Sequence, residues 1–169
     1  MNTESRVVAE LVARQQITEV LHSYCRGLDR MDRPLADRVW HSDGTADYGP
    51  GYRGTGSGFL DFVWDFHLKL EKHSHMVSNT IISVDVSAGT ATSETYVSVW
   101  LRSAPSNGTV IDKHHRGRYL DRWSFRDDRW AIDHRIYVGD LMHETSNPAG
   151  PETWGRRDTE DLSYQVLGN

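Results

Sequence analysis

The hydrophobic pattern changes midway along the chain, from the spacing of helices to the alternation of strands, and this change restricts the fold most strongly. Apolar residues recur at spacings of three, four or six over about residues 5–30, which predicts one long amphipathic helix. A proline at its start predicts a short second helix over residues 34–40. Ser57 can cap a third helix, whose apolar set spans residues 59–70.

The second half of the chain is rich in β-branched and aromatic residues, and turn signals divide it into four predicted strands over residues 75–86, 90–101, 117–125 and 130–139. Strands joined by short turns indicate an antiparallel meander. Helices followed by strands favour an α+β fold. We therefore expect about three N-terminal helices to cover a cone-shaped, curved antiparallel sheet of about four long strands.

Length and composition bound the class of protein. The 169 residues suit one domain, which we expect over residues 1–140, followed by a tail over 141–169 that packs on it or on a neighbouring subunit. A net charge of -5 without a basic block argues against a nucleic-acid partner, and the apolar runs are too short to cross a membrane. The first residues lack a signal-peptide pattern, and the single cysteine, Cys25, fits a reducing compartment, so we expect a cytoplasmic protein.

An aspartate and a histidine are the main candidates for chemistry. Asp29 falls at the end of the long helix, where the helix dipole disfavours a carboxylate, so an imidazolium partner explains it better than Arg33 does. His75 is the predicted general base, because an imidazole suits proton transfer at neutral pH. His73, on the same strand face, is the alternative base. Tyr24 either packs in the core or offers its hydroxyl to a substrate.

Further candidates are predicted from their chemistry. Large aromatic side chains can form the walls of an apolar cavity, and inward arginines can hold an oxyanion or a phenolate. The predicted substrate-binding residues are Trp40, Tyr48, His73, Tyr96, Trp100, Arg118, Tyr119 and Arg135. A metal site is the competing interpretation of the many histidines, among them His67, His114 and His115, but no ordered two-His-one-carboxylate spacing is evident. This spacing therefore argues against a metal site.

An ordered set of motifs resembles a known family over roughly residues 5–140. The set is Tyr24-x-x-x-x-Asp29, His75-Met-x-x-Asn79, Gly117-Arg-Tyr119-x-Asp121-x-Trp123 and Trp130-x-Ile132-x-x-Arg135. It is similar to the SnoaL-like group of the nuclear transport factor 2-like superfamily, and in particular to its lyases of the scytalone dehydratase, lindane dehydrochlorinase and bile-acid 7α-dehydratase type. The resemblance implies a cystatin-like α+β barrel, commonly a dimer or trimer. It also implies cofactor-free catalysis by an Asp–His pair, here Asp29 and His75, with Tyr24 nearby.

The expected function is therefore elimination of a small fragment from a hydrophobic, ring-bearing molecule. His75 takes a proton, Asp29 orients it, and Tyr24 or an arginine stabilises the developing charge. The fragment is water, halide or formaldehyde, the last from a substrate such as a lignin-derived aromatic. Two other classes stay open: an isomerase or polyketide-cyclase-like enzyme, and a non-catalytic binding or dioxygenase-accessory subunit. We expect a homodimer or homotrimer.

Overall fold

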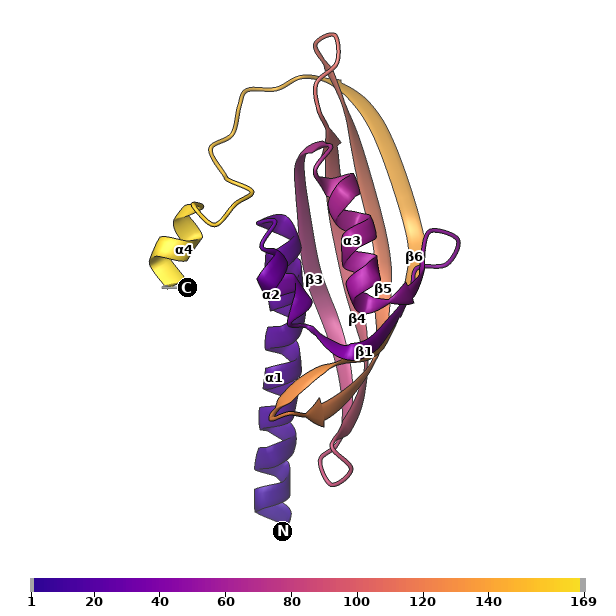
Figure 1. Ribbon diagram of the computed structural model, residues 1–169, viewed down its shortest axis with the longest axis vertical. Helices are drawn as coiled ribbons and strands as arrows, with labels where there is room; N and C mark the ends of the chain where they lie inside the picture. The colour runs from indigo at the N-terminus through magenta and orange to yellow at the C-terminus, as the bar shows by residue number, and fades with distance from the viewer. Residues whose placement is uncertain (1, 168–169) are drawn as a thin grey trace.

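A computed structural model describes residues 2–167 of the chain. Three helices and two short strands make up the first part, and four long strands and a short helix follow (Figure 1). The elements are α1 (Thr3–Asp29), α2 (Arg33–Asp37), β1 (Trp40–Asp47), β2 (Arg53–Thr55), α3 (Gly56–His67), β3 (Leu70–Asp85), β4 (Thr90–Ser103), β5 (Thr109–Arg126), β6 (Arg129–Pro148) and α4 (Leu162–Leu167).

Side-chain caps fix where the helices begin. The side chain of Asn2 accepts a hydrogen bond from the Ser5 N–H at the start of α1, and Asp32 does the same for Leu35 at the start of α2. Helix α3 is capped by Thr55 and not by Ser57, so it begins earlier than predicted. The Asp32 cap lies in the turn between α1 and α2, which contact each other, and Asp29 is the last residue of α1.

The sheet has six strands in the order β2-β1-β6-β5-β4-β3. The four long strands form the predicted antiparallel meander. The sheet is curved but unclosed, with β2 and β3 at its edges, and α1 runs beside the β3 edge (Figure 1). The predicted α+β class is confirmed, whereas the predicted count of about four strands omits the two short ones.

Strand β1 could not be predicted from local preference, because Trp40-His-Ser-Asp-Gly-Thr-Ala-Asp47 is mostly polar and contains a glycine. Tertiary contacts hold it parallel to β6, with an irregular register between Trp40 and Thr45. A Cβ on Gly44 would lie 2.6 Å from the backbone oxygen of Ile132, so only glycine allows this close approach. The buried side chains of Trp40 and Ala46 anchor the strand.

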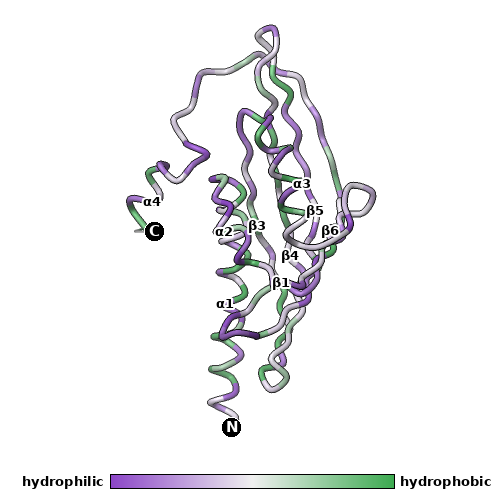
Figure 2. The backbone as a smooth tube through the Cα atoms, viewed as in Figure 1, coloured by the Kyte–Doolittle hydropathy of each residue, from purple (hydrophilic) through white to green (hydrophobic). Residues whose placement is uncertain are grey.

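The hydrophobic core lies between the helices and the concave face of the sheet. Hydrophobic residues recur along α1 and α3, as the green stretches of the tube in Figure 2 show. The most buried large side chains include Ile17, Leu21, Tyr24, Leu28, Leu60, Trp123 and Ile132. None of the helices in the described part of the chain is long and apolar enough to cross a membrane.

The segment after β6 returns to the body through polar contacts. Strand β6 continues to Pro148, past the residue at which the tail was predicted to begin. Arg157 donates hydrogen bonds to the carbonyl oxygens of His67 and Leu70, where α3 gives way to β3. The Tyr164 hydroxyl donates to Asp32 Oδ2 at 2.6 Å. These contacts bring the short helix α4 beside the C-terminal end of α1 (Figure 1).

Candidate active site

The end of α1 and the edge strand β3 bring Asp29 and His75 into direct contact. Asp29 Oδ1 lies 2.7 Å from His75 Nδ1. The same carboxylate accepts the backbone N–H of His75, at 3.0 Å and 2.9 Å to its two oxygens. The side chains are 14% and 6% exposed for Asp29 and His75. The carboxylate thus holds the backbone and the ring of His75 together, and it orients Nδ1 as the donor so that Nε2 carries the lone pair.

Two further imidazoles stand beside this pair. The rings of His67 and His73 stack with centroids 4.1 Å apart, and those of His67 and His75 lie 5.6 Å apart. His73 Nε2 donates to the Leu28 carbonyl oxygen at 2.8 Å. Burial lowers the pKa of His67 to about 2 and that of His73 to about 4. Both rings are therefore neutral at pH 7, and of the three histidines only His75 contacts a carboxylate among the described residues.

A buried polar cluster fills the core beside α1. Arg135 donates from Nε and Nη2 to the two oxygens of Asp121, at 2.7 Å and 2.8 Å. Its guanidinium lies 3.9 Å from the ring centre of Tyr119 and 4.6 Å from that of Tyr24. The hydroxyl groups of Tyr24 and Tyr48 are 3.0 Å apart. This cluster contains four of the predicted site residues, Tyr24, Tyr48, Tyr119 and Arg135, in one packed group with Trp40 at its border.

The tyrosines of this cluster are held as neutral donors. Burial raises the pKa of Tyr24 well above its usual value, and Tyr48 and Tyr119 raise it further. Burial likewise raises the pKa of Tyr119. Burial alone would lower the pKa of Arg135, but Asp121 outweighs it and the pKa is raised well above its usual value. The cluster thus offers hydroxyl donors and one fixed positive charge, and no proton acceptor comparable to His75.

Three predicted binding residues lie on the opposite face of the sheet, so their prediction as cavity walls needs correction. Tyr96 and Trp100 are 40% and 50% exposed, because they alternate with the inward Val97, Val99 and Leu101 along β4. Trp100 stacks on His114 at 4.4 Å between ring centres. Arg118 is engaged in ion pairs with Asp140 and Glu94. The alternation was predicted, but the sequence did not say which face the helices cover.

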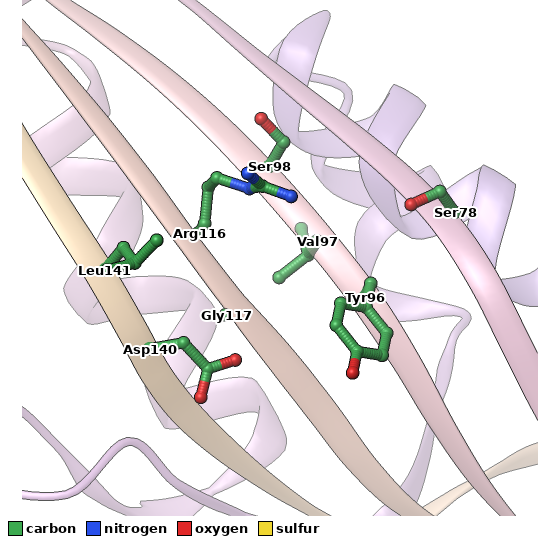
Figure 3. A pocket seen from close by; sticks show the side chains of 8 residues that line it. All are labelled: Ser78, Tyr96, Val97, Ser98, Arg116, Gly117, Asp140 and Leu141. Carbon is green, nitrogen blue, oxygen red and sulfur yellow. The ribbon is translucent and has the colours of Figure 1, made fainter.

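This outer face carries its own shallow hollow of about 180 Å³. Figure 3 shows Tyr96, Ser98, Arg116 and Asp140 around it, on strands β4, β5 and β6. The hollow is separate from the Asp29–His75 pair, which lies on the inner side at the edge strand.

A second hollow, of about 350 Å³, reaches the pair itself. Its lining includes Cys25, Arg26, Asp29 and His75, together with Ser163 from the tail. Burial, followed by the charge of Asp29, raises the pKa of Cys25 to about 12, so this thiol is not a nucleophile at neutral pH. Within residues 2–167, no group of three or more His, Cys, Asp or Glu side chains is arranged to hold a metal ion.

One contact of the site follows from strand pairing, and another was not predicted. Cross-strand pairing of the strand arginines with aspartates such as Asp121 is the ordinary expectation for a hairpin, and Asp121 lies directly opposite Arg135 between β5 and β6. Arg157 was assigned no role, since nothing in its local sequence indicates that it binds the end of α3. Its contact with His67 joins segments 90 residues apart in the chain, which periodicity cannot show.

Solved structures share this fold. A protein from Novosphingobium aromaticivorans, provisionally described as a scytalone dehydratase, is 20% identical, with a TM-score of 0.72 over 87% of this chain and 99% of that chain. A hexachlorocyclohexane dehydrochlorinase, LinA-type3 from Novosphingobium barchaimii, is 14% identical, with a TM-score of 0.67 over 87% and 97%. A cystatin-like protein of unknown function from Nostoc punctiforme is 21% identical, with a TM-score of 0.59 over 75% and 90%. Identities this low show the fold alone.

The sequence comparisons add the family. A search of curated proteins found no match to the chain. The model of the SnoaL-like domain family, in contrast, matches residues 9–136, which include most of α1, then α2, both short strands, α3 and most of the meander. The chain belongs to the SnoaL-like domain family.

Proposed function

We propose that the protein is a cofactor-independent lyase that eliminates a small fragment from a hydrophobic, ring-bearing small molecule. The observation that carries the proposal is the contact between Asp29 and His75, which are 2.7 Å apart and largely shielded from water. Similarity in fold to proteins described as a scytalone dehydratase and a dehydrochlorinase supports the same reaction class.

In this proposal His75 Nε2 is the base. It removes a proton from carbon, or from a hydroxyl when formaldehyde leaves in a retro-aldol cleavage. Asp29 holds Nδ1–H and stabilises the imidazolium that forms, as a buried carboxylate does beside a catalytic histidine. In an elimination, the electron pair left on the substrate forms the new double bond as halide departs, or as hydroxide departs and takes the proton back from the His75 imidazolium to leave as water. In the retro-aldol cleavage, the C–C bond breaks as the C=O bond of formaldehyde forms, and the imidazolium returns its proton to the carbon that is left. A positioned base contributes about 10²- to 10⁴-fold to the rate.

The neighbouring histidines favour His75 over His73 as the base. His73 is bound to the Leu28 carbonyl, and its lowered pKa makes it a weak proton acceptor. His67 is weaker still, with a pKa of about 2. Of the predicted partners, Tyr24 is a candidate donor to a leaving group, since burial raises the pKa of its hydroxyl and keeps it protonated. The site is assembled within one chain, and we expect the protein to form a homodimer or homotrimer.

A turnover screen tests the proposal. Purified protein without added cofactor is incubated with arylpropane diols, phenolic dimers, hydroxysteroids and chlorinated rings, with and without a chelator, and products are identified by mass. We expect a product lighter by water, hydrogen halide or formaldehyde, made by wild type and not by His75→Gln. A product of unchanged mass would make the enzyme an isomerase or cyclase. Turnover that His75→Gln retains in full would refute the base, and turnover lost on chelation and restored by zinc or iron would refute metal-free chemistry.

A further inference from the structure

His115 lies in the same cross-strand row as His75. His75 pairs with Val99 on β4, and Val99 pairs with His115 on β5. Residues directly opposite in antiparallel strands share a face, and Val99 packs against the hydrophobic core. The row therefore places both imidazoles on the inner face, with their backbones two strand spacings, or about 10 Å, apart.

One buried ring nitrogen of His115 is available for a hydrogen bond. His115 Nε2 is shielded from water and has no hydrogen-bond partner among the described residues. Leaving a buried polar atom unpaired is unfavourable, so such an atom suggests a partner that arrives with a ligand. The adjacent His114 differs: it lies on the outer face, and its Nε2 is 2.7 Å from Ser98 Oγ.

The electrostatic setting of His115 favours a neutral ring. Burial lowers its pKa, and the charge of Lys113 and the nearby His114 lower it further. A ring with a lowered pKa is a weaker proton acceptor, but its N–H can donate to an oxygen that gains negative charge. Neutral histidines polarise substrate carbonyl groups in this way in other enzymes.

Building on the proposed function, we propose that His115 donates a hydrogen bond from Nε2 to the substrate oxygen on which negative charge develops while His75 removes a proton from carbon. The substrate is then a ring-bearing carbonyl compound with its leaving group β to the carbonyl. His75 takes the α-proton, and the electron pair of the C–H bond moves to the carbonyl oxygen to form an enolate. The pair returns to form the C=C bond as the leaving group departs with its own bonding pair. When hydroxide leaves, the imidazolium of His75 returns the proton and water is released.

An enolate mimic separates this role from that of the base. 4-Nitrophenolate carries its charge on one oxygen of a ring, and its absorbance reports binding. We expect wild type and His75→Gln to bind it alike, His115→Phe to bind at least tenfold more weakly, and His115→Gln, which keeps an N–H donor, to restore most of the affinity. His114→Gln is the matched control and should bind as wild type does. Circular dichroism confirms that each variant is folded.

The outcomes for the two proposals are distinct. No phenolate binding to wild type, or equal affinity in wild type and His115→Phe, would overturn the role of His115 and leave the base untouched. On a β-leaving-group ketone found by the screen, we expect His115→Phe to lower kcat by about 10²- to 10³-fold with a smaller change in KM, the size of one lost oxyanion donor. Turnover undiminished in His75→Gln would instead refute the lyase mechanism itself.

Discussion

The buried ion pair between Asp121 and Arg135 allows a quantitative test of the core. Both side chains are 0% exposed, and Arg135 donates to both carboxylate oxygens. Asp121→Asn keeps the shape of the side chain but leaves the guanidinium charge uncompensated. Breaking a fully buried pair in this way costs about 3–5 kcal/mol. For a chain of this length the loss corresponds to a fall in Tm of roughly 6–20 °C.

Urea unfolding followed by tryptophan fluorescence measures the effect. The double variant Asp121→Leu with Arg135→Met removes both charges and should recover much of the lost stability, because apolar replacements of a buried pair are often neutral. Asp158→Asn breaks an ion pair with Arg156 in which both side chains are about half exposed, and should change stability little. A loss below about 1 kcal/mol for Asp121→Asn would show that the pair is not desolvated as described.

Three other perturbations test separate parts of the structure. In the folded protein the pKa values of His73 and His67 are about 4 and about 2, below the ordinary histidine value of about 6.5. Below about pH 6.5 the unfolded chain therefore binds more protons than the folded protein does. Stability should therefore fall as the pH drops from about 6.5 towards 4, and His73→Gln should flatten the urea-midpoint profile between pH 7 and 5; an unchanged slope contradicts this. Because burial raises the pKa of Cys25 to about 12, iodoacetamide should label it at least ~100-fold faster in urea than in the native protein at pH 8, and equal rates would argue against its burial. The two-residue hairpin loop has φ of 53° at Asp127 and 57° at Asp128, so Asp128→Gly should raise the free energy of unfolding by up to about 1 kcal/mol, and a clear decrease would contradict that backbone geometry.

The parts of the fold that could be predicted are those with a strong local pattern. The long strands alternate apolar and polar residues, and α1 carries a stripe of buried residues such as Ile17, Leu21 and Leu28, so their type and order follow from the sequence. Strand β1 lacks such a pattern. Its place depends instead on backbone pairing with β6 and on the close approach of Gly44 to Ile132, so it could not be predicted from local sequence.

The same division applies to the site. The proximity of Asp29 and His75 was inferred from a family pattern, and the structure brings these side chains together at the end of α1 and the edge of β3. Which face of the sheet becomes concave is decided by the packing of α1 and α3, so the outward positions of Tyr96, Trp100 and Arg118 could not be read from alternation alone. The partnerless nitrogen of His115 likewise depends on neighbours distant in sequence.

The most direct test of the central claim is kcat/KM of Asp29→Asn against wild type on the substrate that the screen identifies. Asparagine can keep a hydrogen bond to the backbone of His75, but it cannot stabilise the imidazolium or fix the Nδ1–H tautomer. Asp32→Asn, three residues further along, is the control, because Asp32 caps α2 and contacts Tyr164 but not His75. We predict a loss of about 10²- to 10⁴-fold for Asp29→Asn at unchanged fold, with Asp32→Asn close to wild type. If Asp29→Asn keeps its kcat/KM within about threefold of wild type, Asp29 and His75 do not act together as the base, whatever their separation.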